Sequence, residues 1–309
     1  MREKRIKKKG MNKKLKITLI TLIIVICTMG VVIGGFIYNK LSKINTNSIN
    51  VKDSEIGIDF ETKENEKKKD VTSIALLGLD KEENATDVNM ILTLDDDNRE
   101  MRLLSILRDS YIYYGSDKIN KLNYAIHYGG PINTIKVINQ TYNTAVRDYI
   151  LIDFNGISNI IDALGGIPMY LEPEEIKMMV SNRNLKIGNN IINGEEALSY
   201  IRIRRIDSDF KRTQRQRNVI QAIYNKMKSM SLGQANKFID VALKNVETSL
   251  SYTEILSLGQ KILSYGGNPL KEGRIPLDGT WKQGEESIYY MKWDKESNLK
   301  YVHEFIYGQ

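Results

Sequence analysis

The chain has 309 residues, of which 41% are apolar and 27% charged, and this ordinary globular mixture excludes a mostly disordered protein. The formal net charge of +7 is concentrated at the N-terminus, where residues 1–40 carry 10 Lys and Arg against one acidic residue, while the other 269 residues carry 35 against 37. Because most of the chain is slightly acidic, a nucleic-acid-binding protein is disfavoured. The single cysteine excludes a disulfide framework and a Cys₄ zinc site, and the two histidines lack metal-ligand spacing.

The N-terminal segment predicts a membrane anchor. Residues 17–38 contain no charge and are long enough to cross a bilayer core, which takes about 20 helical residues. Nine Lys and Arg precede this run, so the positive-inside rule predicts a cytoplasmic tail over 1–16, a transmembrane helix over 17–38 and an extracellular remainder. A cleaved signal peptide is the alternative, but the apolar run is long for one and no Ala-x-Ala follows. We therefore expect a single-pass protein of the cell membrane.

The segment that follows predicts a linker and then one folded domain. Residues 39–70 are polar and end in a run of charges, which favours an extracellular linker with little fixed structure. Apolar runs then predict strands over 71–80, 89–95, 101–107, 148–154 and 167–172. Helical patterns cover 131–142, 154–166, 212–230, about 234–247, 252–264 and 294–307, with a strand pair before the last of them. This order predicts an α/β domain over 71–309 with a central mixed β-sheet flanked by helices.

Two carboxylates flank the turn after the first predicted strand. Asp80 ends that strand, and Asp87 comes just before the next one. Ligands of layered α/β proteins gather at the carboxyl ends of strands, and paired carboxylates can hold Mg²⁺, which prefers oxygen ligands. From spacing alone, an ordinary role as turn or cap residues remains the more common outcome.

Arg108 and Asp109 follow the strand predicted over 101–107. The planar guanidinium of an arginine there can bind phosphate through two parallel hydrogen bonds. An ordinary ion pair at the strand end is the better interpretation of these two residues taken alone.

The densest signal is the segment YIRIRRIDSDFKRTQRQR, residues 200–217, with seven basic residues against two acidic ones. In an extended conformation, Arg202 and Arg204 would face one side and the isoleucines beside them the core. Arg212 and Gln216 are four residues apart and would share one face of the following helix. The cluster indicates a phosphate or pyrophosphate site, with membrane headgroups or a solvated helix face as the alternatives.

Seven segments taken together resemble the LytR-CpsA-Psr family of cell-wall enzymes. No single segment is specific, but all occur in the family's order: ALLGLD (75–80), TDVNMIL (86–92), LLSILRDSYI (103–112), KINKLNYAIHYGGP (118–131), DYILIDFNGISNIIDALGGI (148–167), INGEEALSYIRIRRIDSDFKRTQRQRNVI (192–220) and IPLDGTW (275–281). A membrane helix with basic flanks before the domain is also similar to the family.

The resemblance implies an extracytoplasmic phosphotransferase. Such proteins move glycopolymers, for example teichoic acids or capsular polysaccharides, from undecaprenyl pyrophosphate to peptidoglycan, and they form a phosphodiester. By resemblance, Asp80 and Asp87 match the carboxylates that hold Mg²⁺. The pyrophosphate-binding set matches Arg108, Arg202, Arg204, Arg212 and Gln216, with Lys118 less securely. Arg108 and Arg202 would then act in catalysis, and Asp209 is a weaker candidate for a base.

One position departs from the family pattern and keeps other functions open. The family commonly has an arginine two residues before the second metal-binding aspartate, where this chain has Ala85. A non-catalytic, membrane-tethered binder of polyprenyl-phosphate precursors is therefore one alternative. A pyrophosphatase that hydrolyses the lipid-linked glycan with water is another.

Overall fold

The computed structural model describes residues 45–46, 52–67, 69–114, 118–180, 184–203, 209–230, 238, 241–265, 268–284 and 288–308. The predicted cytoplasmic tail (1–16) and transmembrane helix (17–38) lie outside these residues. Among the helices that are described, none has the length and apolar character needed to cross a bilayer.

A seven-stranded sheet forms the centre of the unit that spans residues 45–309. Its strand order is β1 (Asn45–Thr46), β10 (Val246–Thr248), β7 (Asp148–Asp153), β2 (Val71–Asp80), β3 (Ala85–Asp95), β4 (Glu100–Ile106) and β11 (Leu270–Ile275). β2 is parallel to β7 and β4 to β11, whereas β3 runs antiparallel to both of its neighbours. The prediction of a central mixed sheet is therefore confirmed, and β2, β4, β7 and β11 all end at the same edge.

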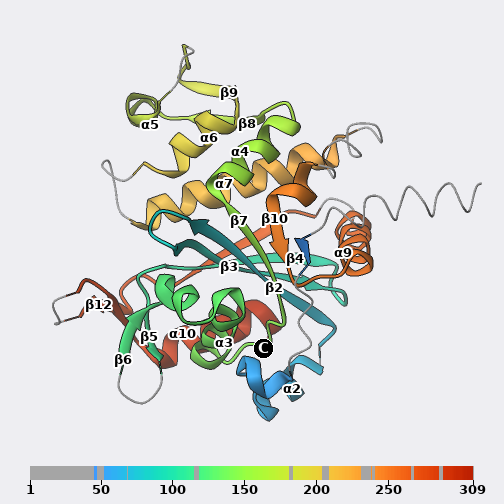
Figure 1. Cartoon of the computed structure of the whole chain (residues 1–309), viewed down its shortest axis with the longest axis vertical. Helices are drawn as coiled ribbons and strands as arrows, with labels where there is room; N and C mark the ends of the chain where they lie inside the picture. The colour runs from blue at the N-terminus through green and yellow to red at the C-terminus, as the bar shows by residue number, and fades with distance from the viewer. Residues whose placement is uncertain are drawn as a thin grey trace, which may run out of the picture. The chain divides into compact units, whose positions relative to one another are not determined.

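Helices cover both faces of the sheet (Figure 1). On one face, the 3₁₀ helix η2 (Leu122–Tyr128), α3 (Gly130–Tyr142) and α10 (Lys295–Tyr307) share an apolar core with the central strands. On the other face lie α4 (Phe154–Ala163), α6 (Gly194–Ile201) and α7 (Asp209–Lys228). These three helices build a second core with the ribbon of β8 (Ile167–Leu171) and β9 (Gly188–Ile192). Because both faces are covered, β2 and β4 read as nearly continuous apolar runs.

The remaining elements surround this three-layer arrangement. α5 (Pro173–Met178) lies between β8 and β9 in the chain, and α9 (Tyr252–Ser264) precedes β11. Two small hairpins lie outside the main sheet: β5 (Tyr111–Tyr114) pairs with β6 (Lys118–Lys121), and β12 (Trp281–Gln283) pairs with β13 (Met291–Trp293). Of the helix predicted over about 234–247, the described residues show a helical turn that ends at 245.

Polar side chains fix where the helices near the strand ends begin. The carboxylate of Asp153 caps α4 by accepting a hydrogen bond from the backbone N–H of Gly156 at 2.6 Å. α6 begins with a capping box in which Asn193 and Glu196 each accept the other's backbone N–H. The first cap starts α4 directly after β7 ends, and the capping box starts α6 directly after β9.

The prediction of a linker with little fixed structure is wrong for residues 53–67. They form the 3₁₀ helix η1 (Asp53–Ile56) and helix α2 (Phe60–Lys67). Ile56 and Ile58 are buried against Ala145, and Arg147 binds the carboxylates of both Asp53 and Glu66. The charged residues of this segment are typical of a solvated linker, but Asp53 and Glu66 form ion pairs with Arg147 of the domain.

Candidate functional site

The strand directions gather the predicted site residues at one edge of the sheet. Asp80 is the last residue of β2, Arg108 follows the end of β4, and Phe154 follows the end of β7. β3 runs in the opposite direction, so its first residues, including Asp87, lie at this same edge. We call this place the strand-end edge, and it is where layered α/β proteins place their ligands.

A β-bulge sets the position of Asp87. The ladder pairs Gly78 with Val88 and then Leu79 with Thr86, so Asp87 is the extra residue of β3 at this bulge. Its side chain is nevertheless buried, with only 6% exposed. Bulges re-aim side chains and are over-represented beside active sites. Here the bulge directs the carboxylate toward Arg108.

Arg108 is held among carboxylates. Its Nη1 lies 2.6 Å from Oδ1 of Asp87, and its Nε lies 3.4 Å from Oδ2 of Asp109. Burial by itself would lower the pKa of this guanidinium, but the charges of Asp87, Asp109 and Asp209 outweigh burial and raise it. Arg108 therefore stays cationic in a half-buried position, as a phosphate-binding group must.

The first turns of α7 complete the cluster around Arg108. Nη1 of Arg212 lies 3.1 Å from Oδ1 of Asp209, and the Arg212 side chain is only 4% exposed. Gln216, one turn further on, is also buried. Since the charge of Asp209 acts on Arg108, the strand-end edge and the start of α7 face each other. The structure thus brings together five residues that the sequence analysis singled out: Asp87, Arg108, Asp209, Arg212 and Gln216.

Lys121 is a member of this cluster that the sequence analysis missed. Its Nζ lies 2.8 Å from Oδ1 of Asp109, and its side chain is 15% exposed. The predicted Lys118 is the first residue of β6, but its side chain lies outside the described part of the structure. Both lysines belong to the segment KINK, and nothing in its sequence marks which of them reaches the site.

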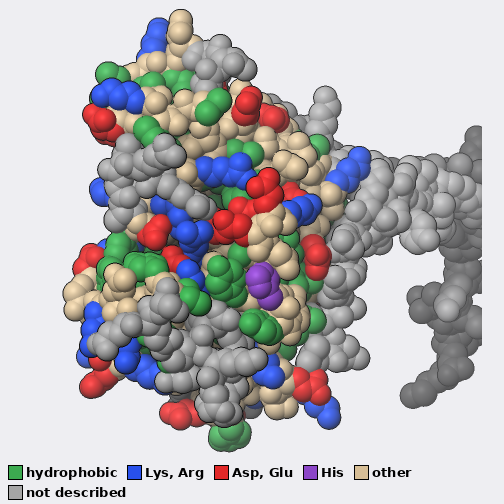
Figure 2. All heavy atoms as spheres, turned by 60° about the vertical axis from the view of Figure 1, so that its left-hand side comes forward, with side chains coloured by type: hydrophobic (Ala, Val, Ile, Leu, Met, Phe, Trp, Pro, Cys, Tyr) green, Lys and Arg blue, Asp and Glu red, His purple; other side chains and the backbone are tan. Residues whose placement is uncertain are grey.

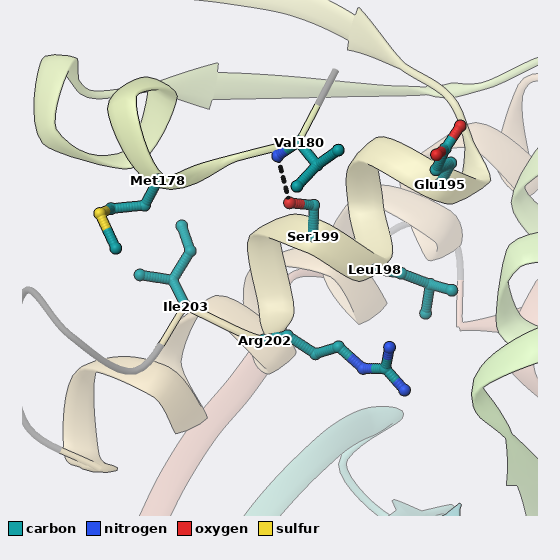
Figure 3. Close-up of a pocket in the computed structure, with 7 residues that line it drawn as sticks. All are labelled: Met178, Val180, Glu195, Leu198, Ser199, Arg202 and Ile203. Carbon is teal, nitrogen blue, oxygen red and sulfur yellow. Dashed lines mark hydrogen bonds between the residues drawn. The ribbon is translucent and has the colours of Figure 1, made fainter. Parts of the chain in front are cut away.

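Arg202 lies further along the same edge. Its guanidinium stacks on the ring of Phe154, with 3.9 Å between Cζ and the ring centroid. Three strand intervals, or about 14 Å, separate the ends of β7 and β4, so Arg202 and Arg108 flank the edge from two positions. Figure 3 shows that the Arg202 guanidinium points away from Met178 and Val180, with which it lines a pocket of about 470 Å³.

The extended conformation considered for Arg202 and Arg204 does not begin at Ile201. α6 continues to Ile201, and Arg202 is its C-cap residue. The expected separation of side chains still holds, because Ile201 and Ile203 are buried and Arg202 is exposed. Arg204 lies outside the described residues.

Asp80 serves the turn between β2 and β3. Its Oδ1 accepts hydrogen bonds from the backbone N–H groups of Glu82 at 2.9 Å and Glu83 at 3.3 Å. Among the described residues, no group of three or more His, Cys, Asp or Glu side chains is arranged to hold a metal. Asp80 and Asp87 each bring one carboxylate to this end of the β2–β3 hairpin, and carboxylate oxygens are ligands that Mg²⁺ prefers.

Charged groups of both signs meet on this side of the molecule. Figure 2 shows Lys and Arg side chains beside Asp and Glu side chains across the middle of the face it presents. Such a surface can bind an anion on its cationic groups and leave carboxylates for proton transfer or metal binding.

Proteins of known name with similar sequences are teichoic acid transferases. The chain is 29% identical over 244 residues to the polyisoprenyl-teichoic acid–peptidoglycan teichoic acid transferase TagU of Oceanobacillus iheyensis, covering 75% of this chain and 74% of the relative. It is 31% identical over 255 residues to the transferase TagV of Bacillus subtilis that bears the same description, covering 77% and 64%.

Solved structures match as well. A crystal structure of Bacillus subtilis TagV superposes with a TM-score of 0.63 at 27% identity, covering 76% of this chain and 97% of that one. A structure described as TagT bound to LI-WTA superposes with a TM-score of 0.68 at 24% identity, covering 84% and 98%, and it supports the fold alone. The model of the LytR_cpsA_psr family matches residues 31–304. The chain belongs to the LytR_cpsA_psr family.

Proposed function

We propose that this protein is a membrane-anchored extracytoplasmic phosphotransferase. It moves a glycopolymer of the teichoic acid or capsular polysaccharide type from undecaprenyl pyrophosphate to peptidoglycan. Family membership and the transferase activity for which the relatives TagU and TagV are named support the reaction class. The apolar run over residues 17–38, behind nine cationic residues, supports an anchor with its N-terminus in the cytoplasm.

The observation that carries the proposal is the setting of Arg108. A guanidinium kept cationic by Asp87, Asp109 and Asp209, with Arg212 beside it, is a site for a multiply charged phosphate. Phosphoryl transfer needs little covalent chemistry from the protein, since positioning and neutralisation of charge do most of the work. Carboxylates hold the two arginines in place, and the guanidinium groups would exchange some of these contacts for pyrophosphate oxygens.

Each residue then has a part in the transfer. A sugar hydroxyl of peptidoglycan attacks the phosphorus that bears the polymer, and the bond to polyprenyl phosphate breaks. Arg108, Arg212 and Arg202 bind the pyrophosphate oxygens and stabilise the charge that grows on the leaving phosphate. Arg204, the Gln216 amide and Lys118 would add contacts to these oxygens. Asp209 accepts the proton of the attacking hydroxyl.

Asp80 and Asp87 would hold Mg²⁺, which supplies further neutralisation of the phosphate oxygens when it is bound. Both side chains are carboxylates, and the turn between β2 and β3 brings them to one end of the hairpin. In this arrangement Asp87 would serve both the ion and Arg108, so its loss is expected to weaken two interactions.

The test uses the full chain in lipid nanodiscs with a polyprenyl-pyrophosphate-linked oligosaccharide and a peptidoglycan fragment, with and without Mg²⁺. Mass spectrometry would follow the phosphodiester-linked product and the released polyprenyl phosphate. We expect a product that requires Mg²⁺ and that falls by at least 100-fold in Arg202→Ala, a variant of an exposed residue. Full transfer by both Arg108→Ala and Arg202→Ala would contradict the proposal.

Ala85 supports a second candidate function, a binder of lipid-linked precursors that does not turn them over. The Ala85 side chain is fully buried at the start of β3, so this position supplies no charge to the site. Tight binding of the donor with no product from several donors would favour the binder. Hydrolysis of the donor without a linked product would instead identify a pyrophosphatase.

A further inference from the structure

Two arginines that stack on phenylalanine rings flank the strand-end edge. The guanidinium of Arg202 stacks on Phe154 where β7 ends. The guanidinium of Arg274 stacks on Phe210, with 4.1 Å between its Cζ and the ring centroid. Arg274 is the second-last residue of β11, the strand next to β4. Four strand intervals, or about 19 Å, separate the ends of β7 and β11, so the two stacks lie on opposite sides of Arg108.

The pairing of β11 places Arg274 on the same face of the sheet as the start of α7. Arg274 is opposite Ser105 in the parallel ladder with β4, and Ser105 accepts a hydrogen bond from Arg217 of α7. Phe210, on which Arg274 stacks, directly follows Asp209 in the first turn of α7. Because Asp209 is the proposed acceptor of the proton of the attacking hydroxyl, Arg274 lies on the side of the site where the acceptor sugar must bind.

The guanidinium of Arg274 is partly exposed and has donors to spare. Its Nη2 donates to Oδ2 of Asp278, and its Nη1 donates to the carbonyl oxygen of Pro276 at 3.4 Å. An arginine has five N–H groups, and the others of Arg274 have no hydrogen-bond partner among the residues that the structure describes. The Asp278 side chain is 79% exposed, and such surface pairs contribute little. An incoming anion can therefore use the remaining donors or replace Asp278.

A pocket of about 290 Å³ opens beside Arg274, between α7, β11 and α10. Arg217 and Glu272 also line it, but they are committed to each other, since Arg217 donates from Nε to Glu272 at 3.0 Å. Glu272 also accepts a hydrogen bond from the Gln214 amide at 3.0 Å. Of the two arginines in the lining, Arg274 is therefore the one that can bind an anionic ligand.

We propose that Arg274 determines acceptor specificity by binding a carboxylate of the peptide that peptidoglycan carries on its sugars. The inference rests on the proposed function, which makes peptidoglycan the acceptor and Asp209 the base. The planar guanidinium matches a carboxylate through two parallel hydrogen bonds. Phe210 covers one face of the guanidinium, and stacking leaves the N–H groups at its edge available to the ligand.

The acceptor fits this position better than the donor does. In the proposed reaction the pyrophosphate of the donor is bound by Arg108, Arg212 and Arg202. The acceptor has to bring a sugar hydroxyl to Asp209, and in peptidoglycan the peptide is attached to the sugar chain itself. A peptide carboxylate thus comes close to the hydroxyl, and Arg274 is the arginine beside that place.

The experiment measures binding to the full chain in nanodiscs by calorimetry. The two probes are a soluble uncrosslinked peptidoglycan fragment with free peptide carboxylates and the same fragment with these carboxylates amidated. We expect Arg274→Met to weaken binding of the carboxylate fragment by at least about 10-fold and to leave binding of the amidated fragment unchanged. Arg274→Lys keeps the charge without the planar fork and should recover part of the loss. The matched control is Lys271→Met, because Lys271 is an exposed cation near the start of β11.

Transfer assays with the lipid-linked donor give a second readout. Arg274→Met should raise KM for the carboxylate fragment and leave KM for the donor unchanged. Loss of carboxylate-dependent binding in Arg274→Met, in a protein that transfers nothing, would retain the carboxylate site and remove the phosphotransfer. Equal losses for both fragments would mean that Arg274 only supports the fold. That result, an unchanged affinity for the carboxylate fragment, a raised KM for the donor alone, or no binding of this fragment by the unaltered chain would overturn the inference.

Discussion

Arg108 and Arg217 are both buried arginines near the strand-end edge, but their surroundings differ. Arg108 keeps 17% of its side chain exposed, and three carboxylates raise its pKa. Arg217 is 5% exposed, and burial lowers its pKa even though Glu272 acts in the opposite direction. Its Nε lies 3.0 Å from Glu272, and its Nη1 donates to Oγ of Ser105 at 3.1 Å. Arg108 is partly exposed and can exchange partners, whereas Glu272 and Ser105 commit Arg217 to the fold.

The arginines of helix α7 have different roles at its start and further along its length. Arg212 pairs with Asp209 at the start of the helix, beside Arg108. Arg215 donates from Nη2 to the carbonyl oxygen of Ile203 at 2.8 Å and so ties α7 to the end of α6. Arg217 ties the same helix to β4 and β11. One basic segment of the sequence thus supplies both a candidate phosphate site and the ion pairs that hold that site in place.

The largest effect is expected from Arg108→Ala. Removal of one group that stabilises charge in the transition state typically costs 10² to 10³ in rate, so we expect transfer to fall by about 10³-fold. Initial rates of phosphodiester formation measure this loss, with Lys300→Ala as the control for an exposed cation. A rate within about threefold of the unaltered protein would show that Arg108 belongs with Arg217 as a group of the fold.

The next effect tests the other side of the comparison. Arg217→Met removes the ion pair with Glu272, which keeps a hydrogen bond from the Gln214 amide. Breaking a buried pair costs about 3–5 kcal/mol, and less where one partner is partly exposed, as Glu272 is. We expect the free energy of unfolding to fall by about 2–3 kcal/mol in a urea titration, while molecules that remain folded transfer at nearly the normal rate. Lost transfer with unchanged stability would place Arg217 in the site.

Much of the fold follows from local pattern. The apolar runs that became β2, β3, β4 and β7 and the helix begun at Gly130–Pro131 were predictable because each is fixed by short-range periodicity and by turn or cap residues. The two helices within residues 53–67, η1 and α2, could not be predicted from local pattern. Their stability comes from Ile56 and Ile58 against Ala145 and from Arg147, which is about 80 residues or more away in the sequence.

The candidate site was predictable to the extent that strand ends and the start of a helix mark it. Asp80, Arg108 and Arg212 stand at such positions, and Asp87 stands at a bulge that the sequence does not reveal. The different surroundings of Arg212 and Arg217 could not be predicted from the sequence. They depend on Ser105 and Glu272, which contact α7 from β4 and β11. Lys121 was missed for the same reason, since its place in the site depends on its ion pair with Asp109.

A smaller effect is expected where Arg202 stacks on Phe154 at the strand-end edge. Phe154→Leu removes the ring beneath Arg202, and such a cation–π contact is worth about 0.5–1 kcal/mol at an exposed site. We expect KM for the lipid-linked donor to rise by about two- to fivefold while kcat changes little. Phe154→Tyr keeps an aromatic face and should restore KM. A fall in kcat alone would mean that Phe154 acts on the chemical step and not on the placement of Arg202.

The smallest effect lies far from the site and tests the reassigned segment over 53–67. Hydrogen bonding to Arg147, and then to Lys63, lowers the pKa of Asp53 below its ordinary value. A lowered pKa in the folded state means that the carboxylate stabilises the fold above the ordinary aspartate pKa of about 3.9, and that this contribution disappears as the pH falls through the folded value. Asp53→Asn should therefore reduce the free energy of unfolding by about 1 kcal/mol or less at pH 7, because the pair is partly exposed. The difference between variant and unaltered chain should shrink as the pH falls and vanish below the lowered pKa of Asp53, since protonation then removes the charge from the unaltered protein as well. Equal stability of the two proteins at pH 7 would mean that the buried isoleucines alone hold this segment to the domain.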